Sequence, residues 1–287
     1  MKTIVIFGSG FLGTQLASRL NDDGMNVVSI TDRITSGEQA VSILKKIKDP
    51  FVVINAIGKT GKPNIDWCED HKDETLQSNV DVPLMLAHAA WSHPRALPFI
   101  QVSSGCIFNG ADRVFRETDE PNFDGSYYSY TKKLAEEALQ SIAEKDFPDR
   151  AKLEIHRIRM PFVGYPDPRN LFTKLIAYSR VVNTENSVTS VDDYLSFVSN
   201  RISGWVADDE HGAGVMTMPD FSWKEILHCV NEEPITHKRI LEIFQEIDPG
   251  GDHLNKDFIT SEQLDSITKA PRTNCVLRMS DKFISRP

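Results

Sequence analysis

The stretch T-I-V-I-F-G-S-G-F-L-G, residues 3–13, joins an unbroken apolar run to three glycines in the pattern G-x-G-x-x-G. An apolar run without polar alternation is typical of a strand that is covered on both faces, as in a parallel sheet. Glycines directly after such a strand permit a tight turn, close approach of the backbone to a pyrophosphate, and close packing of the next helix. The N-terminus of that helix attracts the anion. This context favours dinucleotide binding over a merely structural turn.

Strands and helices are expected to alternate over the first two-thirds of the chain. Apolar runs predict strands at residues 3–7, 26–30, 51–55, 98–103 and 153–158. Helical periodicity predicts helices at residues 11–21, 39–48, 76–91 and 129–144. Such alternation implies right-handed crossovers and an α/β fold with a doubly wound parallel sheet, which is Rossmann-like.

The pattern loosens after Pro161, which suggests a second, smaller unit. A short helix is expected at residues 171–179, a return to the sheet domain at 188–200, and short helices and loops from residue 212 onward. We therefore predict an NADP(H)-binding domain over residues 1–162 and 181–205. A smaller C-terminal substrate lobe would take residues 163–180 and 206–287.

Composition narrows the function further. The 287 residues include 32 Lys plus Arg and 41 Asp plus Glu, so the formal charge is 32 − 41 = −9, which argues against nucleic acid as a partner. No apolar run approaches the roughly 20 residues of a membrane span, and the N-terminal run is too short for a signal peptide. Four cysteines form no C-x-x-C pair and eight histidines no H-x-x-x-H pattern. We therefore expect a cytoplasmic protein without a metal site or membrane association.

The end of the second predicted strand bears on the choice of cofactor. An acidic residue there binds the ribose hydroxyls of NAD, whereas an arginine accommodates the 2′-phosphate of NADP. The chain has both, as Asp32 and Arg33. Asp32 could instead cap the following segment, and Arg33 could be a solvated surface charge. We favour NADP(H) over NAD(H), because a guanidinium matches phosphate geometry and gains little beside a diol.

A tyrosine and a lysine mark the candidate reaction centre. Tyr128 and Lys132 are four residues apart at the start of a predicted helix, and so share one face. A neighbouring cation favours phenolate and would lower the pKa of Tyr128. The alternative is a tyrosine ring packed on lysine methylenes. Ser104 at the end of the fourth strand could hydrogen-bond a carbonyl substrate, and Asn79 in the preceding helix offers polar support.

These pieces, in this order, resemble the extended short-chain dehydrogenase/reductase family. The matching segments are G-S-G-F-L-G at 8–13, N-A-I-G at 55–58, N-V at 79–80, S-S-G-C at 103–106 and Y-Y-S-Y-T-K at 127–132. The resemblance implies Tyr128 as proton donor, Lys132 as its electrostatic partner and ribose ligand, and Ser104 as a ligand of the substrate. The cofactor-binding residues it implies are Gly8, Gly10, Phe11, Leu12, Gly13, Asp32, Arg33, Asn55, Ala56, Gly58, Asn79 and Lys132.

Longer segments are similar to the nucleotide-rhamnose synthase/epimerase-reductase enzymes, which convert UDP-4-keto-6-deoxyglucose to UDP-L-rhamnose by 3,5-epimerisation and 4-reduction. These segments are G-K-T-G-K-P-N-I-D-W-C-E at 58–69, C-I-F at 106–108, P-N-F-D-G-S-Y-Y at 121–128, P-R-N-L-F-T-K at 168–174 and A-P-R-T-N at 270–274. The first glycine loop departs from the bulkier G-x-x-G-x-x-G of the plant enzymes, so their cofactor preference is not transferred.

The similarity implies further site residues. Cys106 would face the same pocket as Ser104 if the chain stays extended, and a thiolate could remove a proton next to a ketone. The resemblance implies Cys106 and Lys174 as the base and acid of epimerisation; otherwise Cys106 is a small buried hydrophobe and Lys174 a surface charge. Arg169 and Arg272 would suit the diphosphate of a nucleotide sugar, or could instead tie loops together. We add to them, as substrate-binding residues, Asn64 and Asn170.

Three functions follow as hypotheses. The first is an NADP(H)-dependent nucleotide-sugar 3,5-epimerase/4-reductase, whose substrate carries UDP or dTDP. The second is a plain 4-reductase resembling dTDP-4-dehydrorhamnose reductase, with Cys106 only structural. The third is a catalytically silent dinucleotide-binding regulatory subunit, against which the intact pair Tyr128 and Lys132 counts. A homodimer is compatible with the resemblance.

Overall fold

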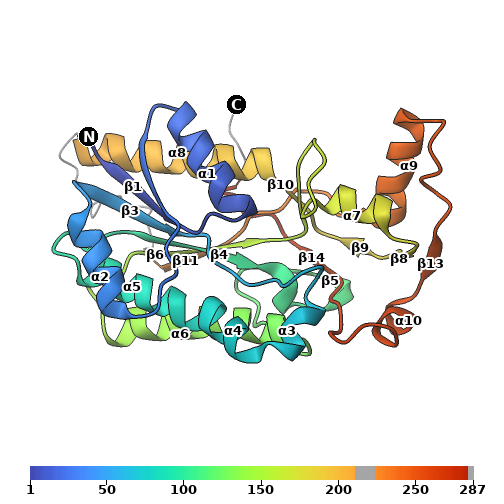
Figure 1. Ribbon diagram of the computed structural model, residues 1–287, viewed down its shortest axis with the longest axis horizontal. Coiled ribbons are helices and arrows are strands. Elements are labelled where there is room, and N and C mark those ends of the chain that lie inside the picture. The colour runs from blue at the N-terminus through green and yellow to red at the C-terminus, as the bar shows by residue number, and fades with distance from the viewer. Residues whose placement is uncertain (211–223, 284–287) are drawn as a thin grey trace.

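Six parallel strands form the central sheet of the computed structural model, which describes residues 1–210 and 224–283 (Figure 1). Their order across the sheet is β11-β6-β4-β3-β1-β2, with every neighbouring pair parallel. The strands are β1 (Thr3–Phe7), β2 (Asn26–Ile30), β3 (Pro50–Asn55), β4 (Phe99–Ser104), β6 (Leu153–Ile158) and β11 (Lys224–His228). This architecture confirms the predicted α/β fold with a doubly wound sheet.

Helices cover both faces of the sheet (Figure 1). Helices α1 (Phe11–Asp22) and α8 (Val191–Glu210) lie on one face, and α2 (Gly37–Lys46), α5 (Val82–Ser92) and α6 (Tyr127–Lys145) lie on the other. Successive side chains of a strand point to opposite faces. In β1, Ile4 and Ile6 accordingly join the core under α1 and α8, whereas Val5 and Phe7 join the core on α2, α5 and α6.

The strand of the central sheet that was not predicted is β11. Its sequence K-E-I-L-H carries two charges and a histidine, so it lacks the apolar run that indicates a buried strand. It nevertheless pairs with β6 at the edge of the central sheet. Residues 224–228 therefore extend the sheet from within the segment that we had assigned to the lobe, while the division of the chain into two units stays a prediction.

The predicted helix at residues 76–91 is part of a longer helical run. It begins with α4 (Lys72–Leu76), passes through a π-helical turn at Gln77–Asp81, and continues as α5. Single π-turns inside helices often occur at functional sites, because they displace side chains from regular helical spacing. Here the π-turn buries Asn79 against α6.

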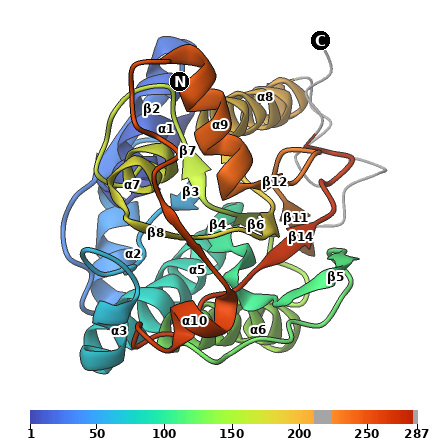
Figure 2. The same ribbon diagram turned by 90° about the vertical axis from the view of Figure 1, so that its right-hand side faces the viewer.

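Short elements cluster beyond the carboxyl ends of the strands, on the side that faces the viewer in Figure 2. Helices α7 (Leu171–Ala177) and α9 (His237–Ile247) pack with strands β8 (Arg180–Val182) and β13 (Asp257–Ile259) around a small separate core. The remaining elements are α3 (Asp66–Asp70), β5 (Gly110–Phe115), β7 (Pro161–Phe162), β9 (Glu185–Asn186), β10 (Thr189–Ser190), β12 (Ile235–Thr236), α10 (Ser261–Asp265) and β14 (Cys275–Leu277). In the described residues, no helix combines the length and apolar character needed to cross a membrane.

Candidate active site

The candidate site lies where the carboxyl ends of the parallel strands meet. Gly8 follows β1, Asn55 ends β3, Ser104 ends β4 and Arg159 follows β6. In open α/β sheets, ligands bind in the crevice outside these strand ends, at the point where the strand order reverses. The topology therefore brings residues from four separate parts of the chain to one edge.

The glycine loop leaves no room for side chains at two positions. Gly8 has φ +105°, and a Cβ there would lie 2.9 Å from the carbonyl carbon of Ala56. A Cβ on Gly13 would lie 2.0 Å from the carbonyl oxygen of Gly8, so the first turn of α1 can pack only without one. The loop and the start of α1 thus have the shape required to receive a dinucleotide diphosphate.

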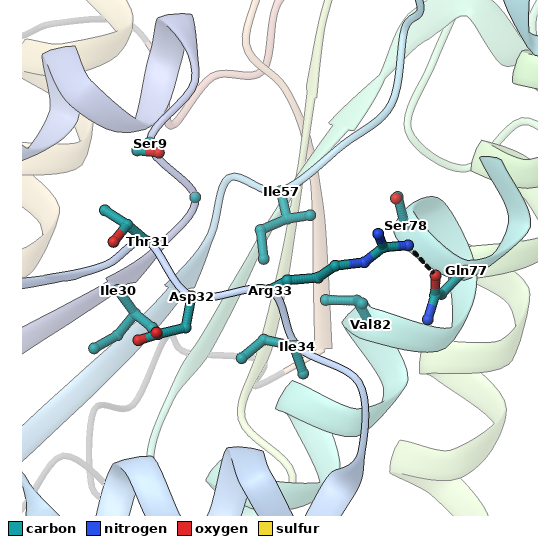
Figure 3. Close-up of a pocket in the computed structure, with 11 residues that line it drawn as sticks. Ser9, Ile30, Thr31, Asp32, Arg33, Ile34, Ile57, Gln77, Ser78 and Val82 are labelled. Atoms are coloured by element: carbon teal, nitrogen blue, oxygen red, sulfur yellow. Dashed lines mark hydrogen bonds between the residues drawn. The ribbon is translucent and has the colours of Figure 1, made fainter. Parts of the chain in front are cut away.

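A pocket of about 200 Å³ lies beside this loop (Figure 3). Asp32 and Arg33, both predicted as cofactor-binding residues, line it. Arg33 extends between Ile57 and Val82, and its Nη2 donates to Oε1 of Gln77 at 2.9 Å (Figure 3). Asp32 lies on the side of Ile30. The residues present fit the adenosine half of a nicotinamide dinucleotide, with a cation and a carboxylate both available at its ribose.

The loop after β3 is held by two buried asparagines. Asn55 donates from Nδ2 to Oε1 of Gln101 at 2.8 Å and accepts from the backbone N–H of Ile57 at 3.0 Å. Asn79 accepts from the backbone N–H of Lys59 at 2.7 Å and donates to Oγ1 of Thr131 at 3.1 Å. Asn79 therefore connects the loop to α6. Both predicted cofactor residues act here by shaping the loop that also contains Ala56 and Gly58.

Tyr128 lies in the first turn of α6, which begins where Ser126 caps the helix by accepting from the backbone N–H of Ser129. Its phenol is buried and shares a hydrogen bond with Ser104. The expected lowering of its pKa was wrong. Burial, reinforced by Cys106, raises the pKa of Tyr128 well above its usual range, and the hydrogen bond to Ser104 offsets only part of this. Tyr128 therefore keeps its proton at neutral pH and can donate it.

Lys132 is buried one turn further along α6. Its Nζ donates to the backbone oxygen of Val102 in β4 at 3.1 Å. Burial lowers the pKa of Lys132 to about 8, although the carboxylate of Glu136 and the neighbouring Cys106 oppose the shift. Glu136 in turn accepts from Nη2 of Arg157 at 2.7 Å and from Oγ of Ser103. Lys132 is thus a cation at neutral pH that is poised to lose its charge in mildly alkaline solution.

Cys106 lies within a 3₁₀ turn, Gly105–Ile107, rather than in extended chain. The turn starts where the backbone N–H of Cys106 donates to Oγ of Ser104 at 3.1 Å. This turn, and not the extended chain that we predicted, keeps the two residues together. The half-buried thiol accepts from Nη1 of Arg159 at 3.0 Å. Because Cys106 acts on the pKa values of both Tyr128 and Lys132, the three groups form one cluster.

The lobe contributes two cations near the glycine loop. Lys174 lies in α7, where burial lowers its pKa, Arg169 adds to the shift and Asp167 opposes it. Arg169 is exposed, and its Nη1 lies 3.3 Å from the position that a Cβ on Gly10 would occupy. The predicted substrate ligand Arg169 therefore stands over the cofactor loop. The charges that act on Lys174 come from its own segment, so the described contacts do not join it to Cys106.

The other predicted substrate residues already have partners within the chain. Asn64 accepts from the backbone N–H of Asp66 at the start of α3. Asn170 is buried, caps α7, and donates to the carbonyl oxygens of Val163 and Tyr165 at 2.9 and 2.8 Å. Arg272 pairs with Asp66 at 2.9 Å. These contacts shape the walls of the site and tie the C-terminal segment to α3.

A sequence profile described as the RmlD substrate binding domain matches residues 1–196. The chain belongs to this family. A bifunctional dTDP-4-dehydrorhamnose 3,5-epimerase/dTDP-4-dehydrorhamnose reductase of Arabidopsis thaliana is 32% identical over 94% of this chain and 83% of its own. A trifunctional UDP-glucose 4,6-dehydratase/UDP-4-keto-6-deoxy-D-glucose 3,5-epimerase/UDP-4-keto-L-rhamnose-reductase of the same plant is 30% identical over 96% of this chain, which spans only 38% of that longer protein.

Solved structures agree with this assignment. A UDP-rhamnose synthase from Acanthamoeba polyphaga mimivirus superposes with a TM-score of 0.79 at 26% identity, over 99% of this chain and 92% of the other. A dTDP-4-dehydrorhamnose reductase from Bacillus anthracis, in complex with NADP, shares the fold with a TM-score of 0.75 at 18% identity, over 98% and 92% of the two chains. In this RmlD-family chain the matched region ends inside α8, and so contains the glycine loop and the cluster around Cys106.

Sequence reasoning missed two buried charged residues of the RmlD-family site, Glu136 and Arg159. Arg159 directly follows β6, so a charged residue at the carboxyl end of a predicted strand was the available signal. Glu136 lies one turn after Lys132 on the same helical face, a spacing that also could have suggested it. Among residues 1–210 and 224–283, no group of three or more His, Cys, Asp or Glu side chains is placed to hold a metal ion.

Proposed function

We propose that the protein is an NADP(H)-dependent nucleotide-sugar 3,5-epimerase/4-reductase, which converts a UDP- or dTDP-linked 4-keto-6-deoxyglucose to the L-rhamnose nucleotide. The observation that carries this proposal is the convergence of Ser104, Cys106 and Tyr128 at the end of β4, beside the glycine loop. A reductase alone needs only Ser104, Tyr128 and Lys132. The names of the relatives in Arabidopsis thaliana add support for the two-step reaction.

The reduction follows from the groups around Ser104. The nicotinamide dinucleotide would supply the hydride to C4 of the sugar. Tyr128, kept neutral by its burial, gives its proton to the C4 oxygen, while the hydroxyl of Ser104 orients the carbonyl. Lys132, cationic below its pKa of about 8, favours negative charge near the phenol once that proton has left.

Epimerisation uses the same pocket before reduction. Cys106 removes a proton from C3 or C5, and the electron pair of the C–H bond moves into an enolate whose oxygen lies at Tyr128 and Ser104. An acid on the opposite side of the sugar ring must then return a proton to carbon. Lys174 is our candidate for that acid, because α7 belongs to the lobe whereas Cys106 follows β4. Burial lowers the pKa of Lys174, which makes its ammonium group a stronger acid than that of an ordinary lysine.

The substrate diphosphate needs cations in the lobe. Arg169 is exposed and suits this role or the neighbouring cofactor diphosphate. Arg272 would have to share its guanidinium with Asp66. Asn64 and Asn170 contribute through the loops they hold. Of the four predicted substrate ligands, Arg169 is therefore our first candidate for the diphosphate.

Deuterium exchange tests the epimerase step without the reductase step. The 4-keto-6-deoxy sugar nucleotide is incubated in D₂O without reduced cofactor. The unmodified protein should place deuterium at C3 and C5, whereas Cys106→Ser and Lys174→Ala should not. Lys145→Ala, in the exposed last turn of α6, serves as the matched control and should exchange normally.

A second measurement separates loss of epimerisation from loss of folding. Both variants should still oxidise NADPH when they receive a substrate that has been epimerised beforehand. If the unmodified protein oxidises NADPH with that substrate but exchanges no deuterium, it is a plain 4-reductase and the epimerase is rejected. If it does neither while binding NADPH, the regulatory subunit becomes the better description.

A further inference from the structure

Among residues 1–210 and 224–283, the buried cation Arg159 has no carboxylate partner. Its side chain is 2% exposed and lies behind the turn that contains Cys106. Its acceptors in the described chain are Oγ1 of Thr273 at 2.9 Å, the backbone oxygen of Thr273, Oδ1 of Asn186 at 2.7 Å, and Sγ of Cys106 at 3.0 Å. Nε is buried without any partner there. A buried charge is costly unless it is paired, so this guanidinium calls for an anion among its neighbours.

The turn is built so that Arg159 must approach Cys106 closely. Ser104 pairs with Ile158 in the β4–β6 ladder, which sets the residues that follow each strand side by side. Gly105 stands between them, and a Cβ on it would lie 3.3 Å from Cδ of Arg159 and 2.5 Å from Cδ1 of Leu277. The absence of a side chain at Gly105 thus leaves the space that the arginine stem and β14 occupy.

Two thiols lie near the guanidinium, and they have opposite hydrogen-bonding roles. Cys275 donates from Sγ to the backbone oxygen of Gly105 at 3.4 Å, which requires its proton. Burial raises the pKa of Cys275 to about 11 in spite of Arg159, so this thiol stays neutral. Cys106 instead accepts from Nη1 of Arg159. Of the two thiols, only Cys106 is placed to supply the missing anion.

The other titratable groups around Cys106 do not replace this pair. Tyr128 of α6 stays neutral because burial raises its pKa. Lys132 of α6 is a second cation, but it loses its charge above about pH 8. Burial works against the charge on Arg159, yet Cys275, Cys106 and Tyr128 outweigh it in the alkaline range where these groups ionise, and so raise the pKa of the guanidinium. Arg159 therefore keeps its charge beside Cys106 at pH values where Lys132 has lost its own.

We propose that Arg159 is the permanent countercharge that holds Cys106 as a thiolate, and so acts as a positioning residue for the base of the epimerase. The role of Cys106 as the base of the epimerase rests on the proposed function. The pairing of Arg159 with a Cys106 thiolate does not. The resting pair is guanidinium and thiolate. When the thiolate takes a proton from C3 or C5 of the sugar, the negative charge moves to the enolate oxygen near Tyr128, and Arg159 stays close enough to stabilise it.

The charge state of Cys106 can be measured without substrate or cofactor. Thiolates absorb in the near ultraviolet where thiols do not, so the pH titration of the unmodified protein is compared with that of Cys106→Ser. We expect a thiolate signal that is already present at about pH 7 and is lost on acidification, whereas an ordinary thiol ionises at about pH 8.5. A difference that appears only at about pH 8.5 or above would overturn the proposal.

Variants of Arg159 then identify the cation. In Arg159→Met the signal should move to higher pH, and alkylation of Cys106 by iodoacetamide at about pH 7 should slow by about tenfold or more. Arg159→Lys, which retains a positive charge, should restore most of the rate. Arg150→Met is the matched control, because Arg150 donates to the carbonyl oxygens of Trp91 and His93, away from Cys106. Alkylation is followed on the peptide that contains Cys106.

The outcomes separate this proposal from the proposed function. A thiolate in the unmodified protein together with absent deuterium exchange would support Arg159 and reject the epimerase. Deuterium exchange without a thiolate signal would support the epimerase and reject the proposal for Arg159. If Arg159→Met titrates and reacts as the unmodified protein does, Arg159 is a structural arginine and the proposal fails. Should Arg159→Met not fold, as judged by circular dichroism, the titration of the unmodified protein and Arg159→Lys still decide the matter.

Discussion

The guanidinium of Arg33 and the side-chain amide of Gln77 meet at 2.9 Å across the cofactor pocket, although 44 residues separate them in sequence. The contact holds Arg33 extended over the pocket, between the end of β2 and the π-turn before α5 (Figure 3). The bond to Gln77 uses one of the five N–H donors of the guanidinium, so others remain for a phosphate at the ribose. The same contact therefore holds Arg33 at the pocket without neutralising the charge of its guanidinium.

Arg33→Ala should weaken the use of NADPH and spare that of NADH. A charge-assisted phosphate bond contributes about 1.5–3 kcal/mol, so the Michaelis constant for NADPH should rise about ten- to a hundredfold. Steady-state kinetics with each cofactor measure this change. Arg19→Ala is the control, since Arg19 lies on the exposed side of α1 and pairs with Asp23. Equal use of NADPH and NADH by the unmodified protein would contradict the proposed preference.

Tyr128→Phe should nearly abolish 4-reduction and leave the binding of NADPH intact. The phenol donates a proton in the transition state, which contributes about 10²–10⁴ to the rate and little to ground-state affinity. Cofactor binding is measured by fluorescence titration and reduction by the oxidation of NADPH. Lys132→Ala should damage both, because in the proposed function Lys132 would also hold the ribose of the cofactor. More than about a tenth of the activity in Tyr128→Phe would place the proton donor elsewhere.

The reduction should slow as the pH rises through about 8, because Lys132 has a pKa of about 8 and loses its charge above it. The measurement is kcat/KM as a function of pH. Glu136 raises the pKa of Lys132, so Glu136→Gln should move the decline to lower pH, with thermal unfolding as the check on folding. A profile that stays flat far above pH 8 would show that the charge on Lys132 is dispensable.

Acid should destabilise the protein through His228. Burial, together with the neighbouring Arg157, lowers the pKa of His228 from 6.5 to about 4 in the folded chain. Between these values the unfolded chain binds the proton that the folded chain excludes, so stability falls as the pH drops from 6.5 toward 4. At about 1.4 kcal/mol per pKa unit, the loss amounts to a few kcal/mol.

Urea unfolding at both ends of this pH range measures that loss. His228→Gln should be less stable at neutral pH, because His228 bonds to Arg157 and to the backbone oxygen of Arg278, but its stability should depend less on pH. Exposed His88→Gln is the control and should keep the pH dependence of the unmodified protein. An equal pH dependence in all three proteins would exclude His228 as the cause.

The sequence predicted those strands whose apolar residues form a continuous local run. The strands β1, β2, β3, β4 and β6 were predicted to within one residue, because each is an apolar run bounded by polar or turn residues. The edge strand β11 was missed because its two charged residues hide the run. The π-turn at Gln77–Asp81 leaves no mark in helical periodicity, although it places Asn79.

Some residues of the candidate site were likewise predicted from local patterns, whereas others were not. Tyr128, Lys132 and Ser104 were predicted from spacing and strand ends, and Ser104 and Tyr128 do share a hydrogen bond. The direction of the Tyr128 pKa was predicted wrongly, because burial determines it and the cation that lowers it in part is Arg159 rather than Lys132. Arg159 could not be assigned a role, because that role depends on Thr273 and Asn186, which lie far along the chain.

The contacts of the C-terminal segment set the order in which the protein can become active during its own synthesis. The cofactor pocket is lined by residues between Gly8 and Val82, which leave the ribosome early. Arg159 gains its anchor at Thr273, and β14 pairs with β5, only after residues 273–277 have been translated. A nascent or prematurely terminated chain could thus hold a dinucleotide long before Cys106 has its final surroundings. Translation itself would thus delay the final surroundings of Cys106 until residues 273–277 have been made.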